Sequence, residues 1–185
     1  ILYFMNSNGK IVKKIGEKFY KKPGNMPEIA YAMATKTKFA VNPDKSKIAI
    51  GYGLFNKLIC LDTTGKKIFE FQGEEFNNNF KVKGAVIAHE GLKTGYKRVI
   101  ASDHYIFALY NGKVQWSRKD NESYYKNPKT IRVFNWQGEP IVEIKLDREI
   151  RDFIIDKERR RIIACETKKM NPFVTYQLPE VLNLN

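Results

Sequence analysis

The sequence predicts an all-β protein built from several four-stranded antiparallel sheets, and three observations carry this prediction. One hairpin pattern recurs along the chain, a second pair of strands recurs beside it, and helical periodicity is essentially absent. The 185 residues are enough for one domain with a sizeable core. Hydrophobic residues make up 43% and aromatic residues 13% of the chain, which excludes a disordered protein.

The recurring hairpin consists of an apolar strand that ends in Asn or Asp, two variable residues, a Gly and a second strand. We expect the Asn or Asp side chain to accept hydrogen bonds from nearby backbone N–H groups in a type I turn. We expect the Gly to take the left-handed conformation that follows such a turn. The three copies pair Asn6 with Gly9, Asp62 with Gly65, and Asn135 with Gly138.

A second hairpin precedes the first in each complete module. Phe39–Ile50 and Phe153–Ala164 align without a gap, and each has two continuous apolar runs around a charged turn. Continuous apolar runs are typical of strands buried on both faces. Residues 66–71 and 139–144 mix charged with apolar residues, as half-exposed outer strands do. One module is therefore two buried strands followed by two more solvated ones.

The modules follow one another along the chain and are separated by long polar segments. Residues 1–16 are predicted to be the outer hairpin of an incomplete module. The other predicted modules are 37–72, 98–146 and 150–178, the last with three strands. The long segments are a link at 17–36, a link at 73–95 with an extra strand near 85–88, and an insertion at 113–129.

Four-stranded modules in series favour a β-propeller, of which this chain would supply about three and a half blades. Its turn and strand motifs resemble those of the TolB-like six-bladed β-propeller proteins of bacteria. The motifs are Tyr105–Gly112, Ile131–Pro140, Lys145–Arg148 and Phe153–Asp156.

The resemblance implies that residues 1–185 are the C-terminal half of a propeller domain. The ring would be completed by blades that precede Ile1 or by a second half-ring. It also implies an exported, often lipid-anchored protein, located in the periplasm or at the cell surface. The residues themselves show no apolar stretch near the roughly 20 residues of a membrane helix.

Strand topology predicts which end of the propeller binds a ligand. In a four-stranded meander, the second-to-third turn and the link to the next blade lie at the same end, and all three long segments fall there. Long loops on rigid scaffolds tend to carry binding. The candidate ligand residues are Trp116, Arg118, Tyr124, Tyr125 and Lys126 in the insertion, with Tyr20, Lys21 and Lys22 in the first link. Aromatic rings beside cations suit sugar rings, nucleobases or a protein hot spot, and we expect a protein or glycan ligand.

The sequence indicates a binding or interaction module more than an enzyme. Ser102, Asp103 and His104 are the residue types of a catalytic triad, but neighbours on a strand point to alternate sides, so we expect a tight turn instead. His89 is the only other histidine, and we expect no metal site and no cofactor.

Two alternatives stay open. One is a propeller hydrolase or lyase whose catalytic residues lie partly upstream of Ile1. The other follows from the net charge of +13, which would suit a polyanion or nucleic acid. We do not expect nucleic acid to be the partner, because lysine in turns and outer strands also serves solubility and discourages edge pairing.

Overall fold

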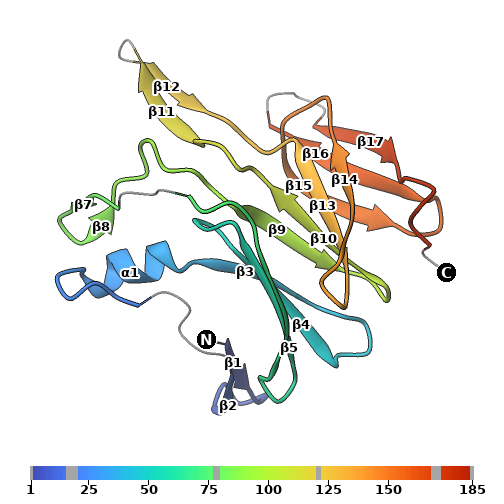
Figure 1. Ribbon diagram of the computed structural model, residues 1–185, viewed down its shortest axis with the longest axis horizontal. Coiled ribbons are helices and arrows are strands. Elements are labelled where there is room, and N and C mark those ends of the chain that lie inside the picture. Colours follow the sequence, from blue (N-terminus) through green and yellow to red (C-terminus); the bar gives the residue numbers. More distant parts are fainter. Residues whose placement is uncertain (1, 16–20, 77–79, 120–121, 168–171, 184–185) are drawn as a thin grey trace.

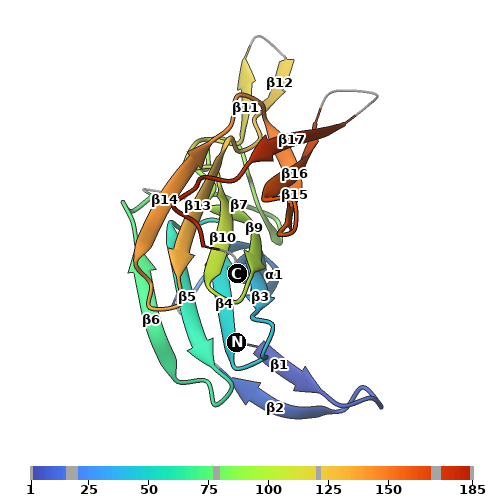
Figure 2. The same ribbon diagram turned by 90° about the vertical axis from the view of Figure 1, so that its right-hand side faces the viewer.

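Three antiparallel sheets follow one another along the chain in the computed structural model, which describes residues 2–15, 21–76, 80–119, 122–167 and 172–183. Figures 1 and 2 show them in sequence order after an N-terminal hairpin. That hairpin consists of β1 (Leu2–Met5) and β2 (Ile11–Ile15). The sheet that we call blade A consists of β3 (Thr37–Val41), β4 (Lys47–Tyr52), β5 (Lys57–Asp62) and β6 (Lys67–Gln72), in that order.

The next two sheets repeat the meander of blade A. Blade B consists of β9 (Tyr96–Ala101), β10 (Tyr105–Tyr110), β13 (Thr130–Asn135) and β14 (Pro140–Lys145). Blade C consists of β15 (Ile150–Asp156), β16 (Arg161–Glu166) and β17 (Phe173–Gln177). The prediction of an all-β propeller segment with four-stranded blades is therefore confirmed.

The long segments carry small elements of their own. The first link holds the helix α1 (Glu28–Ala34), and the second holds β7 (Val82–Lys83) paired with β8 (Val86–Ile87). The insertion of blade B forms a separate two-stranded sheet of β11 (Trp116–Lys119) and β12 (Glu122–Tyr125). β8 is the extra strand expected near residues 85–88. The helix α1 was not expected, because seven residues are too few to show a helical period.

The three Asx–Gly turns have the same hydrogen bonds. In the turn of blade A, Asp62 Oδ1 accepts from the backbone N of Thr64 (2.8 Å) and of Lys66 (3.0 Å), and Gly65 N donates to Asp62 O (3.1 Å). The Gly65 φ angle is +95°, in the left-handed region. Asn6 with Gly9 and Asn135 with Gly138 repeat these contacts. The predicted turn chemistry is confirmed in each copy.

The second strand of each blade is β4, β10 or β16. Its side chains alternate between the face toward the preceding blade and the face toward the following blade. Ile48, Ile106 and Ile162 occupy equivalent positions, and each is buried against the preceding hairpin or blade. The next residues in sequence are Ala49, Phe107 and Ile163. Ala49 is buried against blade B and Phe107 against blade C, whereas Ile163 lies on the open face of blade C. The sheets are thus stacked face to face in one direction, as blades of a propeller are.

Arg132 on β13 ties blade B to blade A. Its Nη1 donates to Oδ1 of Asn56 (2.9 Å), a residue that is 3% exposed, and its Nε lies 3.2 Å from Glu143 Oε2. The guanidinium carbon lies 3.4 Å from the ring centroid of Tyr110, a close cation–π contact. This cluster satisfies a buried polar side chain at the boundary between the two sheets.

At the end that carries the links, a backbone hydrogen bond from Gly95 to Gly53 joins the same two blades, and bonds within each blade hold these two residues in place. Gly53 N donates to Lys36 O (2.9 Å), Gly95 N to Gly53 O (2.8 Å), and Asn111 N to Gly95 O (3.0 Å). This contact requires glycine at position 95, because a Cβ there would lie 2.0 Å from Phe55 O. Blade B therefore starts from a fixed position on blade A.

The substitution Gly95→Ala should lower the free energy of unfolding by about 1–3 kcal/mol or more, because the added methyl group would overlap with the Phe55 carbonyl. Urea denaturation followed by fluorescence measures this loss. Gly24→Ala is the matched control, because a Cβ at Gly24 would have no heavy atom within 4 Å. An equal effect of both substitutions would contradict the proposed close contact.

The turn at Asp62 should make stability depend on pH. Hydrogen bonds from the Thr64 hydroxyl and from backbone N–H groups lower the pKa of the Asp62 carboxyl. Their stabilisation is therefore present above the ordinary Asp pKa of about 3.9 and is lost as the pH falls through the folded-state value. Asp62→Asn keeps the acceptor oxygen used by Asn6 and Asn135. The fall in urea midpoint between pH 7 and pH 2.5 should be smaller in this variant than in the original chain; an identical fall would refute the assignment.

Candidate functional site

The three long segments meet at one end of the blades, which we call the link end. A cluster of apolar side chains packs α1 against the second-to-third turn of blade A and against the second link. Its buried members are Met26, Ala30, Tyr31, Ala34, Leu54, Ile87 and Leu92. Ala30 and Ala34 are 0% exposed, so this side of α1 lies fully against the neighbouring segments. The link end is therefore a packed surface and not a set of separate loops.

The β11–β12 hairpin is attached to the second link at its base. Gly91 N donates to Trp116 O (3.1 Å), and Lys93 and Val114 form a β-bridge. Lys126 N donates to Gln115 O (2.7 Å), which closes the hairpin. Figures 1 and 2 both show the hairpin extending away from the blades. Blade B thus holds a projecting two-stranded ribbon at the link end.

The structure brings only part of the predicted ligand set together. Trp116 is half-buried and pairs with Tyr125, Tyr124 pairs with Ser117, and Lys126 is exposed beyond the hairpin. Arg118 lies on β11, opposite Ser123. The side chains of Arg118, Tyr124 and Tyr125 lie outside what the structure describes. All five candidates of the insertion therefore belong to one two-stranded ribbon or its base.

The candidates of the first link lie elsewhere. Tyr20 falls outside the described residues. Lys21 is exposed, and Lys22 forms an ion pair with Glu28 (Nζ to Oε1, 2.6 Å) at the start of α1. In Figures 1 and 2 the β7–β8 hairpin lies between α1 and the β11–β12 hairpin. Lys22 therefore has an acidic partner within its own link, and the second link separates it from the ribbon.

Sequence reasoning missed a pocket at the base of the link end. It has a volume of about 250 Å³ and lies between blades A and B, under the second link and the root of the insertion. Three lysines line it, Lys36 just before β3, Lys38 on β3 and Lys97 on β9, together with the exposed His89. The other lining side chains are neutral: Met33, Leu54, Thr94, Tyr96, Asn111, Gln115 and Pro128.

Lys97 is a half-buried charge of this pocket with a buried hydrogen-bond partner. Its Nζ donates to Oδ1 of Asn127, which is 4% exposed. Burial lowers the pKa of the Lys97 ammonium; Asp152 opposes this effect, whereas Arg151 and Lys38 reinforce it. One signal in the sequence could have indicated the site, namely the basic residues at the start of two inner strands, next to long links.

Ser102, Asp103 and His104 form a turn between β9 and β10. The Ser102 hydroxyl accepts from Tyr105 N (3.0 Å), and Asp103 forms an ion pair with Lys157 of blade C. Trp136 Nε1 also donates to Ser102 O (3.1 Å). These contacts give Ser102 and Asp103 structural roles in the turn, in agreement with the tight turn that we expected.

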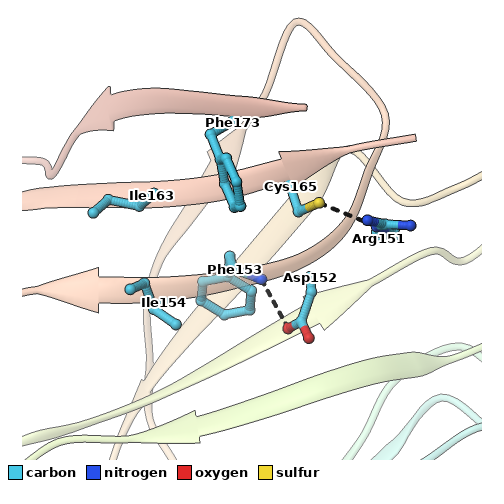
Figure 3. Close-up of a pocket in the computed structure, with 7 residues that line it drawn as sticks. All are labelled: Arg151, Asp152, Phe153, Ile154, Ile163, Cys165 and Phe173. Atoms are coloured by element: carbon cyan, nitrogen blue, oxygen red, sulfur yellow. Dashed lines mark hydrogen bonds between the residues drawn. The ribbon is translucent and has the colours of Figure 1, made fainter. Parts of the chain in front are cut away.

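A larger pocket of about 500 Å³ lies on the open face of blade C (Figure 3). Its apolar lining includes Ile154, Ile163 and Phe173, which the strand register places on one face of the sheet. Ile154 is 55% and Phe173 67% exposed. Since Ile163 is equivalent to Ala49 and Phe107, both buried against the following blade, this pocket has the character of an interblade face.

Two features are absent from the described residues. Within them, no three His, Cys, Asp or Glu side chains gather as a metal site would require. No helix in the described ranges is long and apolar enough to cross a membrane.

Comparisons with known proteins place the chain in a family. A chain of a solved structure described as "Crystal Structure of Mitotic Checkpoint Complex" is 9% identical, with a TM-score of 0.28 over 76% of this chain. The present chain covers 60% of that chain's length. A search of curated proteins gives no match. The model of the TolB-like 6-blade propeller-like family matches residues 2–158, and the chain therefore belongs to this family.

Proposed function

We propose that this chain is an extracytoplasmic interaction module that binds a protein partner at the link end, mainly through the β11–β12 hairpin. The observation that carries the proposal is the gathering of the three long segments at one end of a rigid stack of blades. The packing of the blades does not require segments of this length. Long loops on a rigid scaffold commonly hold the binding residues of a protein.

The hairpin has the composition of a protein-binding surface. Trp, Tyr and Arg are the residues enriched where binding energy concentrates, and Trp116, Arg118, Tyr124 and Tyr125 lie within ten positions of one another. The hairpin is also a two-stranded sheet separate from blade B, so a partner strand could extend it by backbone hydrogen bonds. A glycan that stacks on the aromatic rings is the competing ligand. The extracytoplasmic location is supported by the family, whose members are typically periplasmic.

Replacing residues 116–125 by an Asn-Gly turn between Gln115 and Lys126 should abolish partner binding and leave the blades folded. Folding should persist because β10 and β13 pair directly with each other. The measurement is retention of envelope proteins from the source cell on the immobilised chain, quantified by mass spectrometry, with the thermal midpoint as folding control.

A variant at the opposite end of the blades separates this proposal from a general effect of charge. Lys10→Ala combined with Lys66→Ala changes two exposed turn residues and should leave the retained proteins unchanged. Retention that survives loss of the hairpin but falls in the turn variant would overturn the proposal. Elution by oligosaccharides, with no protein retained through the hairpin, would assign the ribbon to a glycan instead.

We also infer that the open face of blade C is covered by a further blade. Blades A, B and C share one alternation of second-strand side chains, and the open face continues it with Ile163. At the other end of the series, Phe39 on β3 is 58% exposed, whereas its equivalents Val99 and Phe153 are buried. Val41 on the same strand is 43% exposed. Both ends therefore present faces of the kind that stacks on another sheet.

The double substitution Ile154→Lys and Phe173→Lys should convert residues 1–185 from a self-associating species to a monomer in sedimentation velocity. The reason is that two charges would replace apolar contacts at the open face. Lys145→Glu on the outer strand of blade B is a surface control and should leave association unchanged. A segment that is monomeric before any substitution would contradict this inference.

A further inference from the structure

We propose that the pocket at the base of the link end binds a small anion through a carboxylate or phosphate group, with Lys97 and Lys38 as its charge partners. This inference rests on the proposed function of the link end as the ligand face, and it names the chemistry of a second ligand there. It concerns the pocket between blades A and B and not the β11–β12 hairpin.

The charged side chains that line the pocket are all basic. Lys36, Lys38, Lys97 and His89 line the pocket, and no Asp or Glu does so among the described residues. The acids nearby are already engaged, since Asp152 pairs with Arg98 (3.2 Å) and Glu149 Oε2 accepts from Asn127 N (3.1 Å). Converging lysines with no carboxylate in the lining make a site of positive potential.

The backbone of β9 is irregular at Lys97. On β9, Arg98 pairs with Leu109 and Tyr96 with Tyr110, so Lys97 is the extra residue of a β-bulge. Bulges turn a side chain away from the regular alternation of a strand and are frequent beside functional sites. In blade A the equivalent stretch is regular, with Thr37 opposite Tyr52 and Lys38 opposite Gly51. Blade C has the same bulge, because Ile150 lies opposite Glu166 and Asp152 opposite Cys165, which leaves Arg151 as its extra residue. Blades B and C therefore both place a basic residue at this bulge, and in blade B that residue, Lys97, lines the pocket.

Asn127 is a buried polar residue that binds the ammonium of Lys97. It is 4% exposed, and its Oδ1 accepts from Lys97 Nζ, whereas its Nδ2 has no hydrogen-bond partner in the described part of the chain. The hydrogen bond to the buried amide of Asn127 orients the Lys97 ammonium, which has three N–H donors. Asn127 is not itself part of the pocket lining, so it acts on the pocket through the Lys97 ammonium that it binds.

The size of the pocket limits the ligand. A volume of about 250 Å³ equals that of roughly eight water molecules at about 30 Å³ each. A compact organic acid or sugar phosphate fits this volume, whereas a polymer could insert only an end group. Met33, Leu54 and Tyr96 supply an apolar wall against which the carbon skeleton of such a ligand would lie.

Isothermal titration with citrate, inorganic phosphate, glucose 6-phosphate and glucose tests the proposal at constant chloride concentration. At least one of the anions should bind, and glucose should not. Lys97→Met and Lys38→Met should each raise the Kd of that anion about tenfold or more, the loss expected of a charge-assisted hydrogen bond. Lys66→Met removes the same charge from an exposed turn at the other end of the blades and should leave the Kd unchanged.

The variants also separate pocket binding from misfolding and from surface charge. Lys97→Met leaves Asn127 without its lysine and could unfold the chain, so Lys38→Met and the charge-preserving Lys97→Arg are measured beside it. Equal weakening by Lys66→Met and Lys38→Met, or no binding of any anion, would overturn the proposal. Tighter citrate than phosphate binding would identify a carboxylate ligand, and the reverse a phosphate. The hairpin experiment does not depend on these outcomes, so either proposal can fail alone.

Discussion

Burial of an inner strand on both of its faces, as in blade B, is the constraint on which the rest of this structure depends. The second strands show it most clearly, because Ile106 packs toward blade A and the next residue, Phe107, packs toward blade C. Such strands cannot tolerate polar residues in their middle, and the variable chemistry is therefore restricted to their ends. A strand with two buried faces also has little freedom to tilt or slide, since either movement would disturb two interfaces. The segments that leave the strand ends consequently start from fixed positions, which is the property that a binding surface built from loops requires.

The boundary between blades A and B combines this packing with hydrogen bonds, which depend on direction and therefore fix how the two sheets are oriented. The backbone hydrogen bonds from Gly53 to Lys36 and from Gly95 to Gly53 join the starts of the two inner strands. Arg132 binds Asn56 farther out, toward the outer strands. Apolar packing alone is non-directional, whereas these contacts hold only one relative position of the two sheets. The pocket lined by three lysines lies at this boundary, so its shape is set by the same contacts that join the blades.

The parts of the fold that could be predicted from the sequence depend on neighbours in the chain. The Asx–Gly turns were predictable because Asp62 accepts from Thr64 and Lys66, within four residues of itself. The helix α1 was not, because it is stabilised by Ala30 and Ala34 packing on segments far along the chain. The pocket was missed for the same reason. Lys97 lies about sixty positions from Lys36 and Lys38 in the sequence, and each lysine alone resembles an ordinary charged residue at a strand end.

The position of Lys97 shows why the architecture alone does not explain this pocket. Counting back from the turns that follow the inner strands, Thr37 holds the corresponding place in blade A and Arg151 in blade C, so a blade does not require lysine there. A half-buried ammonium loses hydration, and an apolar or neutral side chain in its place would commonly be as stabilising or more so. Asn127 offsets part of that loss through one hydrogen bond, but it is itself left with a buried donor that has no described partner. Two polar groups are therefore held at some cost to stability where the blades meet, beside a space that a compact anion fills. Sites that conflict with the local rules of a fold are the places where function is expected, and this is the part of the link end where the conflict is greatest.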